Sequence, residues 1–334
     1  MIKVAIIGYG YWGPNLARNF SALDQCELSM VADARPERLE ALKKVYPRTK
    51  TTLNPEDAFS SQDVDAVVIA TPVFSHFSLA KKALLNGKHV LLEKPMSATV
   101  AEAEELIAIA RERKLTLMVD HTFLYTSAVG KMKEMIDSGT MGNVKYFDST
   151  RINLGLFQQD VNVLWDLAPH DISILHYLIK QRPVSVNATG VSHTKNGIEN
   201  IAYLTVNYQS DFIAHFNCSW TSPVKLRTLL VGGDKKMMVF NDLEQSEKIR
   251  IYDTRYEYKS DEEKNKLLVD YRTGDILIPK LEIREALLGM AKDFIQSITT
   301  GSAPISGSEM GLEVVKILEA AQHSIKNNGK EILL

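Results

Sequence analysis

The chain is poor in cysteine, in long apolar runs and in net charge. Only two of its 334 residues are cysteines, Cys26 and Cys218, which lie far apart inside apolar runs. This usage excludes a disulfide framework and predicts two reduced thiols in a cytoplasmic protein. No apolar run is long enough to span a membrane, and a first strand that starts at Ile2 leaves no room for a signal peptide.

A strong charge of either sign is also missing. The formal net charge is −2 at pH 7 and no block of basic residues is present, which argues against nucleic acid as a partner. Apolar residues make up 45% of the chain, as in ordinary globular proteins. Because a chain of 334 residues is longer than a single hydrophobic core usually supports, we expect two domains.

A glycine-rich turn near the N-terminus is the clearest motif. An apolar run over residues 4–7 leads into Gly8, Gly10 and Gly13, and the next residues predict a helix. In a dinucleotide-binding unit the first glycine permits the tight turn, the second lets the backbone approach a pyrophosphate, and the third lets the helix pack on the strand. The N–H groups at the helix start suit the phosphates. The residues expected to line the dinucleotide here are Gly8, Gly10, Tyr11, Trp12 and Gly13.

A carboxylate follows the second apolar run. The apolar run at residues 28–32 is followed directly by Asp33, which lies twenty residues beyond Gly13. In a dinucleotide-binding unit, an acidic side chain at this position binds the ribose hydroxyls of the adenosine half. Because Asp33 also repels a 2′-phosphate, NAD is favoured over NADP. NADP stays possible, since Arg35 and Arg38 lie close enough to bind that phosphate, and Arg38 is counted among the expected cofactor contacts.

The order of elements predicts two architectures. Strands and helices alternate through about residue 120, which is typical of a parallel, doubly wound sheet. From residue 144 onward, closely spaced strand-like runs separated by short turns favour an antiparallel sheet. We therefore predict an α/β protein with an N-terminal Rossmann domain, residues 1–122. A C-terminal α+β domain with a mainly antiparallel open sheet, residues 123–334, would bind substrate and form oligomer contacts.

Three local expectations follow from the pattern. Residues 97–113 predict a long helix capped by Ser97. The charged, weakly patterned residues 257–275 predict a loop or a subunit contact. In the strand 213–220 the wholly apolar alternate set is expected to face the core, which leaves Ile213 and His215 on a mixed face that suits a homodimer or homotetramer.

A lysine follows one of the buried strands. Ligands in open parallel sheets bind at the carboxyl ends of the strands, and residues 89–92 are followed there by Glu93, Lys94 and Pro95. Such a lysine is either a surface residue that opens a loop or a residue of the site. The proline fixes the turn and the strand end aims the ammonium at the cofactor crevice, so we adopt the second interpretation.

An aspartate and a histidine share one helix face. A helix that begins near Asp166 places Asp166 and His170 on the same side as Ser173 and Tyr177, opposite an apolar side. Pro169 then falls in the first turn, where proline is tolerated. Both side chains could therefore contact the same small molecule. An aspartate that only caps the helix, next to a histidine without a role, would give the same pattern. No metal is expected, because a zinc site needs three protein ligands.

These motifs together resemble the Gfo/Idh/MocA family of sugar and inositol oxidoreductases. The glycine turn, the Glu93-Lys94-Pro95 strand end and the Asp166 to His170 pair carry the resemblance, which covers nearly the whole chain. It implies that Lys94, Asp166 and His170 correspond to the family's catalytic lysine, aspartate and histidine. The further residues that it implies to line the cofactor are Thr71, His76 and Glu93, together with Lys94.

The resemblance also bears on the substrate. Inositol-type members usually carry a substrate-binding aspartate three residues after the histidine, where this chain has Ser173. The pattern around His121 and Trp165 is more similar to members that act at C3 of nucleotide-linked sugars. A free inositol or hexose dehydrogenase is the alternative. A protein of another class, a dinucleotide-sensing regulator without catalysis, is expected to lack one of the three catalytic side chains, and all three are present.

The chemistry of the three side chains suggests their roles. Oxidation of a secondary alcohol requires proton removal from oxygen while hydride leaves the carbon. We expect His170 to be the general base, because the ordinary pKa of imidazole lies nearest neutrality. Asp166 would orient the sugar hydroxyl or the histidine. Lys94 would stabilise the developing alkoxide, or would itself carry the proton.

Overall fold

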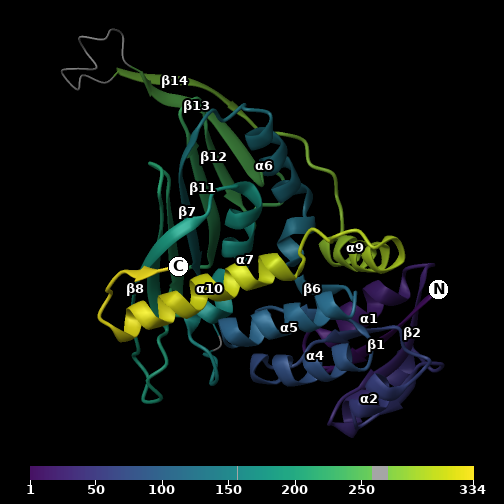
Figure 1. Ribbon diagram of the computed structural model, residues 1–334. Coiled ribbons are helices and arrows are strands. Elements are labelled where there is room, and N and C mark those ends of the chain that lie inside the picture. The colour runs from purple at the N-terminus through teal and green to yellow at the C-terminus, as the bar shows by residue number, and fades with distance from the viewer. Residues whose placement is uncertain (156, 258–269) are drawn as a thin grey trace. The chain divides into compact units, whose positions relative to one another are not determined.

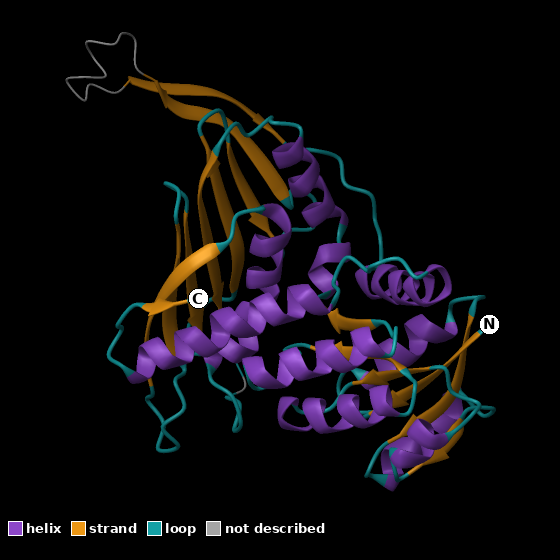
Figure 2. Cartoon of the chain, in the orientation of Figure 1, coloured by secondary structure: helices purple, strands orange, loops and turns teal. Residues whose placement is uncertain are grey.

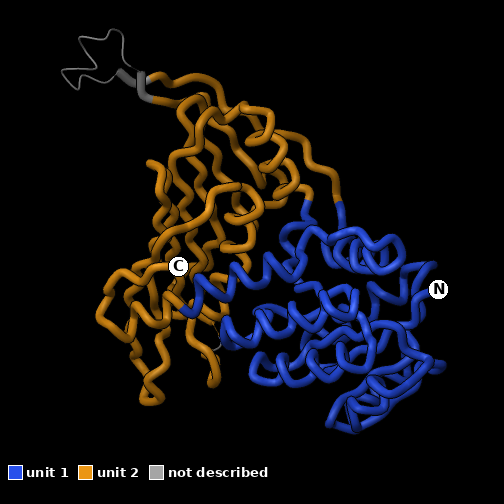
Figure 3. The backbone as a smooth tube through the Cα atoms, viewed as in Figure 1, with its two compact units in different colours: residues 1–126, 284–319 blue, residues 127–283, 320–334 orange. Residues whose placement is uncertain are grey.

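The computed structural model describes residues 1–155, 157–257 and 270–334. The chain forms two compact units, drawn in two colours in Figure 3. The first comprises Met1–Thr126 and Arg284–Glu319, and the second comprises Ser127–Ile283 and Ala320–Leu334. The predicted boundary at residue 122 lies close to Thr126, after which the chain first passes from one unit to the other. The predicted second domain ran unbroken to residue 334, however, whereas Arg284–Glu319 lie in the first unit.

A six-stranded parallel sheet forms the centre of the first unit, in the order β3-β2-β1-β4-β5-β6. Figure 1 labels β1, β2 and β6 of this sheet. The order reverses at β1, which is the topological switch point of a doubly wound sheet. The central strands are apolar along their length because helices cover both faces. The elements are β1 (Ile2–Ile7), α1 (Gly13–Ser21), β2 (Cys26–Ala32), α2 (Pro36–Val45), β3 (Lys50–Thr52), α3 (Glu56–Ser60), β4 (Ala66–Ile69), η1 (Val73–Ser75), α4 (His76–Leu85), β5 (His89–Glu93), α5 (Val100–Glu112), β6 (Leu117–Asp120) and η2 (Thr122–Tyr125).

Helix α9 (Ala286–Thr300) returns to the first unit because its apolar side completes that core. Phe294 is buried and packs edge-on against Phe20 of α1, with ring centroids 6.3 Å apart. Asp293 accepts a 2.7 Å hydrogen bond from the hydroxyl of Tyr125, and Glu285 forms an ion pair with Arg18. Helix periodicity predicts that α9 is buried on one side, but it does not say against which sheet.

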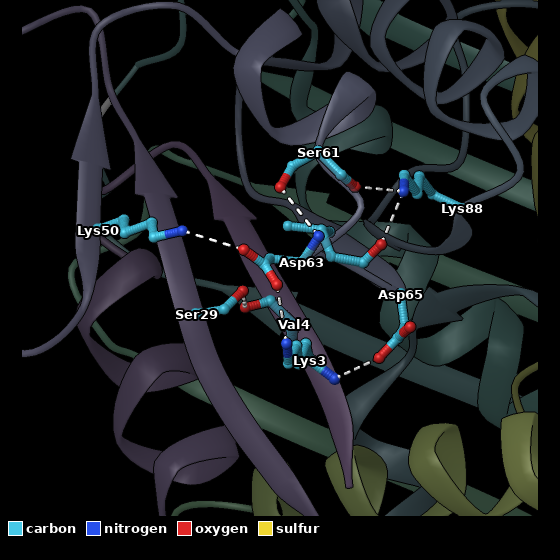
Figure 4. A network of polar contacts seen from close by, with 9 residues as sticks. Lys3, Val4, Ser29, Lys50, Ser61, Asp63, Asp65 and Lys88 are labelled. Carbon is cyan, nitrogen blue, oxygen red and sulfur yellow. Dashed lines mark hydrogen bonds and ion pairs between the residues drawn. The ribbon is translucent and has the colours of Figure 1, made fainter.

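Polar contacts tie together the amino-terminal edge of the same sheet (Figure 4). Asp63 forms ion pairs with Lys3 and Lys50, and the backbone N–H of Lys3 donates to Asp65 over 2.7 Å. The ammonium of Lys88 donates to two backbone carbonyl groups, of Ser61 and Val64. The charged groups at this edge thus form structural contacts. The motifs that could bind a cofactor or take part in a reaction lie at the opposite, carboxyl-terminal edge.

A nine-stranded sheet forms the second unit, in the order β14-β13-β12-β11-β7-β10-β9-β8-β15. The pairs are antiparallel except β7 with β10, which is parallel, so the predicted α/β fold with a mainly antiparallel second sheet is confirmed. Figure 2 shows helices beside the strands of this unit. The elements are α6 (Ser127–Asp137), β7 (Val144–Ile152), α7 (Val163–Leu178), β8 (Pro183–Val191), β9 (Ile201–Tyr208), β10 (Ile213–Ser219), β11 (Leu226–Gly233), β12 (Met237–Asn241), β13 (Ile249–Glu257), β14 (Asp270–Leu277) and β15 (Ile332–Leu333), with α10 (Ser308–Lys326) beginning in the first unit and ending in the second.

Alternation along β10 confirms the predicted core face. The apolar alternate set is fully buried, and helix α7 packs against β7, β9 and β10. Ile213, by contrast, is 48% exposed, and the side chain of His215 is 40% exposed. The buried set is Ala214, Phe216, Cys218 and Trp220. Cys26 and Cys218 are buried free thiols, as the sequence predicts.

Three local predictions need correction. Helix α5 begins at Val100 rather than Ser97, because the side chain of Thr99 caps it by accepting from the backbone N–H of Glu102. Residues 270–275 belong to strand β14 rather than to a loop, and residues 258–269 lie outside the described chain. Helix α7 begins at Val163 rather than near Asp166, so Pro169 stands inside the helix and not in its first turn.

Within the part of the chain that the structure describes, no helix is long and apolar enough to cross a membrane.

Candidate active site

The glycine turn has the geometry that a dinucleotide requires. Gly8 has φ +95°, and a Cβ there would lie 2.4 Å from the carbonyl oxygen of Ala70, so only glycine fits. A Cβ at Gly13 would lie 2.6 Å from the carbonyl oxygen of Gly8. At Gly10 a Cβ would meet only the guanidinium of Arg35, at 3.6 Å. The backbone is thus tightly packed at the first and third glycines and open at the second, where the pyrophosphate approaches.

The start of α1 is also suited to phosphate. Trp12 occupies the N-cap position and makes no side-chain capping hydrogen bond, and the first turn contains no acidic residue. The N–H groups of this turn are therefore available to an anion. Tyr11 and Trp12 are both exposed beside the turn, and their rings contact each other edge-on at 5.4 Å.

Asp33 directly follows β2 as predicted and is held by two neighbours. Its carboxylate accepts 2.9 Å hydrogen bonds from Nε and Nη2 of Arg35, and a 2.7 Å bond from the backbone N–H of Tyr9. Burial alone would raise the pKa of Asp33, but the hydrogen bonds from Arg35 and Tyr9 outweigh burial and lower the pKa to about 2. Arg38 is exposed on α2. The side chain at the adenosine end is thus a carboxylate at every physiological pH.

His76 links two strand ends of the first unit. Its ring nitrogens lie 2.8 Å from the carbonyl oxygen of Thr71 and 2.9 Å from that of Pro95. The first contact reaches the end of β4 and the second reaches the cis Lys94-Pro95 turn after β5. Burial lowers the pKa of His76. His76 therefore braces the lysine turn against β4, which places Thr71, His76 and Lys94 in one cluster.

Glu93 and Asp120 lie beneath this turn, at the ends of neighbouring strands. They are register partners in β5 and β6, and both are buried. Burial, and then the charge of Asp120, raise the pKa of Glu93 well above its usual range. Burial also raises the pKa of Asp120 to about 6. The first unit thus gathers one cation, Lys94, and two buried acids at a single strand edge.

In the second unit, Asp166 and His170 lie one turn apart on α7. Asn162 caps this helix by accepting from the backbone N–H groups of Leu164 and Trp165. Asp166 and His170 are both partly buried. Oδ2 of Asp166 accepts a 3.0 Å hydrogen bond from Nε1 of Trp220. Ser173, which the sequence places on the same face, is buried and donates to the carbonyl oxygen of His170 within its own helix.

A buried ion pair anchors α7 to the sheet. Asp171, next to His170, accepts hydrogen bonds of 2.9 and 2.6 Å from Nε and Nη2 of Arg151 on β7, and a third bond of 2.8 Å from Ser149. Both members of the pair are buried. Removing either one would leave an uncompensated buried charge. The pair therefore fixes the part of the helix that carries His170.

The structure groups the predicted residues by unit. The glycine turn, Asp33, the Thr71 to His76 segment and Lys94 lie at one edge of the first sheet, while Asp166 and His170 lie on α7 of the second unit. Pattern reasoning missed Trp220 as a partner of Asp166. A signal was available, because a buried tryptophan N–H usually finds an acceptor. It also missed Asp120 as a partner of Glu93, which the matching strand ends could have suggested.

Two family models match, one in each unit. The model described as an oxidoreductase family with an NAD-binding Rossmann fold matches residues 2–121, and that of the Gfo/Idh/MocA C-terminal domain matches residues 129–239. The chain belongs to the Gfo/Idh/MocA family. Its Rossmann unit is of the NAD-binding type, and the open Gly10, the uncapped α1 and the carboxylate of Asp33 fit that cofactor.

The family includes relatives with different substrates. An uncharacterised oxidoreductase of Escherichia coli is 31% identical over 182 residues, 51% of each chain. UDP-N-acetylglucosamine 3-dehydrogenase of Acidithiobacillus ferrooxidans is 29% identical over 210 residues, 62% of this chain and 64% of its own. Myo-inositol 2-dehydrogenase of Thermotoga maritima is 23% identical over 339 residues, 97% and 96% of the two chains. This chain therefore spans about half the length of the first relative and less than two thirds of the second.

A solved structure shows the shared fold of this Gfo/Idh/MocA protein. UDP-N-acetylglucosamine 3-dehydrogenase of Acidithiobacillus ferrooxidans matches with a TM-score of 0.80 over 98% of both chains, at 23% identity. At this identity the match establishes the two-unit architecture.

Proposed function

We propose that this protein is a dehydrogenase or ketoreductase that transfers hydride between NAD and a secondary hydroxyl or ketone of a sugar. The observation that carries the proposal is that all three reactive side chains are present, one directly after a strand and two on a helix. Lys94 follows β5 of the NAD-binding unit, and Asp166 and His170 lie on α7. We place the reaction at C3 of a nucleotide-linked sugar, supported by the relative that is a UDP-N-acetylglucosamine 3-dehydrogenase.

Each side chain has a distinct role in this proposal. Bound NAD supplies the hydride chemistry at nicotinamide C4. His170 takes the proton from the sugar hydroxyl during oxidation and returns it during reduction. Asp166, whose Oδ2 is held by Trp220, orients the substrate hydroxyl or the histidine. Lys94 stabilises the negative charge that develops on the reacting oxygen, or exchanges the proton itself.

The cofactor contacts belong to the same proposal. Asp33 selects the ribose hydroxyls of NAD, and the turn from Gly8 to Gly13, with Tyr11 and Trp12, surrounds the pyrophosphate. Arg38 lies on the exposed side of α2, near the adenosine end. The remaining residues proposed to line the cofactor are Thr71, His76, Glu93 and Lys94.

One alternative keeps the chemistry and changes the substrate. A free inositol or hexose would replace the nucleotide sugar, as in the myo-inositol 2-dehydrogenase relative. Ser173 argues against a free inositol or hexose as the substrate. Its buried hydroxyl is hydrogen-bonded within α7, at the position where inositol-type members are expected to carry an aspartate. The other alternative is a regulator that binds NAD without turnover.

The location and assembly are also proposals. Two buried free thiols fit the reducing environment of the cytoplasm. The mixed face around Ile213 and His215 fits a homodimer or homotetramer.

A substrate panel tests the function. Purified protein with NAD or NADH is offered nucleotide sugars, free hexoses, inositols and their keto forms, and the nicotinamide absorbance is followed. Turnover restricted to a nucleotide sugar supports the proposal, and turnover restricted to inositol or hexose supports the first alternative. Binding of NAD without turnover on any of them supports the regulator. Mass spectrometry of ligands that co-purify guides the choice of panel.

A further inference from the structure

The carboxylate of Asp33 has a hydrogen-bond donor at each of its acceptor positions. Oδ1 accepts from the backbone N–H and from Nε of Arg35, both over 2.9 Å. Oδ2 accepts from the backbone N–H of Tyr9 over 2.7 Å and from Nη2 of Arg35 over 2.9 Å. An ionised carboxylate offers about four lone-pair positions. These four bonds therefore leave no position on Asp33 for a further donor.

The four donors differ in how readily they can leave Asp33. Two are backbone N–H groups, one in the glycine turn and one just before α2, so the fold fixes their positions. The other two belong to the guanidinium of Arg35. The side chain of Arg35 is 48% exposed and can move into solvent, whereas that of Asp33 is only 4% exposed. The Arg35 side chain is therefore the part of this arrangement that a ligand can displace.

A ribose matches the guanidinium in the number of its donors. The adenosine ribose of a dinucleotide carries two neighbouring hydroxyl groups, and an acidic residue at the end of the second strand accepts from them. Nε and Nη2 of Arg35 occupy one position on each oxygen of Asp33. Their removal frees two acceptor positions, which is the number that two hydroxyl groups need.

The guanidinium also lies where a dinucleotide is expected to bind. Nη2 of Arg35 is 3.6 Å from the position that a Cβ at Gly10 would take, beside the second glycine of the turn. The pyrophosphate approaches the backbone at this glycine, and it is joined to the adenosine ribose. The ion pair between Arg35 and Asp33 is therefore part of the nucleotide subsite.

We propose that Arg35 competes with the adenosine ribose for Asp33, so that a dinucleotide binds by exchanging its two ribose hydroxyls for the two guanidinium donors. The inference rests on the proposed contact between Asp33 and the ribose. Breaking the ion pair lowers the observed affinity, as it does for any site that is only partly available. Arg35 thus reduces the contribution of the ribose hydroxyls to binding.

The affinities of ADP and 2′,3′-dideoxy-ADP test this competition without any sugar. The two nucleotides share the adenine and the diphosphate, so the ratio of their dissociation constants measures what the ribose hydroxyls contribute. Titration calorimetry should find that Arg35→Ala raises this ratio about threefold to fivefold, the size expected when a half-exposed ion pair no longer has to be broken. An unchanged or lowered ratio would overturn the competition.

Arg48→Ala is the matched control. It removes the same type of side chain and the same charge from an exposed position after α2. Its ratio should equal that of the wild type. A rise as large as that in Arg35→Ala would assign the effect to net charge and reject the competition.

Arg35→Lys is a second variant at the same position. It keeps the positive charge but lacks the planar fork with which a guanidinium bonds two carboxylate oxygens. Its ratio should therefore lie between those of the wild type and Arg35→Ala. Because the charge beside Asp33 is kept, this variant decides the question if Arg35→Ala does not fold. A ratio no higher than that of the wild type would then count against the competition.

Asp33→Asn shows whether the effect passes through the carboxylate. Without that charge the guanidinium is no longer held at the subsite. Adding Arg35→Ala to Asp33→Asn should therefore change the ratio by less than about twofold, because the two substitutions are coupled. A rise of the same size with and without Asp33→Asn would show that Arg35 acts elsewhere and would refute the proposal.

A crystal structure of the wild type with ADP shows the exchange directly. Both ribose hydroxyls should lie within hydrogen-bond distance of Asp33, one at each carboxylate oxygen, with Nε and Nη2 of Arg35 moved away. A guanidinium that keeps both of its bonds beside bound ADP would contradict the inference.

The inference and the proposed function can fail separately. A wild type that shows the expected ratios but turns over no sugar would overturn the proposed function and leave the competition standing. A wild type that turns over a sugar, but whose ratio does not respond to Arg35→Ala, would overturn the competition alone. Failure of the wild type to bind ADP would also overturn the competition, whatever the sugar panel shows.

Discussion

The indole Nε1 of Trp220 donates a 3.0 Å hydrogen bond to Oδ2 of Asp166. The two residues are 54 positions apart in sequence, and the bond joins the end of β10 to the first turns of α7. Trp220 is buried, so its N–H has exchanged water for a carboxylate. This bond occupies one carboxylate oxygen and thereby fixes the orientation of the other.

Trp220→Phe removes this donor while keeping an aromatic ring. We expect kcat to fall about tenfold, because hydrogen bonds to charged groups contribute about 1.5–3 kcal/mol. NAD binding should be unchanged, since Trp220 lies in the second unit. Steady-state kinetics and a cofactor titration measure the two effects. Phe157→Leu, which alters the ring contact with Trp220 at 5.6 Å but leaves the indole N–H, is the control. A similar loss in both variants would assign the effect to packing.

Lys94→Ala and His170→Ala test the proposed chemistry directly. Each should reduce turnover by orders of magnitude, since proton transfer alone contributes about 10²–10⁴-fold. Neither should unfold its unit, because the cores do not depend on these side chains. Melting curves and NAD titrations are therefore expected to resemble those of the wild type. Near-normal turnover in either variant would remove that residue from the mechanism.

Asp33→Ala tests the cofactor preference. The wild type should bind NAD more tightly than NADP, because the carboxylate accepts from the 2′-hydroxyl and repels a 2′-phosphate. The variant should lose NAD affinity and keep NADP affinity. It also releases the guanidinium of Arg35, which Asp33 holds through two bonds. Arg35→Ala is the matched variant, and fluorescence titration measures the affinities. Equal losses for both cofactors in Asp33→Ala would contradict the assignment.

The lowered pKa of Asp33 predicts a pH dependence of stability. Its pKa falls from 3.8 to about 2 in the folded protein. The stabilisation is therefore fully present above pH 4 and is lost as the pH falls towards 2, because folding must then hold a carboxylate that the unfolded chain has already protonated. The contribution is about 2 kcal/mol. Urea unfolding between pH 5 and pH 2 should show a smaller acid loss for Asp33→Asn than for the wild type. Parallel curves would remove Asp33 as the source.

The exposed face of the nine-stranded sheet predicts self-association. Ile213 is half exposed there, and His215 stacks on Tyr203 of β9 with ring centroids 6.4 Å apart. Light scattering at micromolar concentration should find a dimer or tetramer, which Ile213→Glu with His215→Glu converts to monomer. Leu53→Glu, at an exposed apolar position of the first unit, should leave assembly unchanged. A monomeric wild type would contradict the prediction, and an oligomer unaffected by the double substitution would place the interface elsewhere.

Sequence patterns predicted local secondary structure better than they predicted which distant residues contact each other. The buried alternate set of the strand at residues 213–220 was predicted correctly, because the alternation of apolar residues is a local pattern. The start of α7 was missed, since Asn162 caps an almost wholly apolar turn that offers no contrast between faces. Asp33 and Lys94 directly follow strands β2 and β5, as the pattern predicts. Contacts across the chain, such as Trp220 with Asp166, depend on tertiary packing that periodicity does not encode.

The division of the chain has an evolutionary consequence. The polypeptide passes between the units three times, after residues 126, 283 and 319. The Rossmann sheet therefore depends on a late segment, α9, for part of its core. A gene rearrangement that exchanged only the N-terminal 122 codons would separate that sheet from the helix that completes its core. Residues 1–122 on their own thus lack part of the core that packs against their sheet.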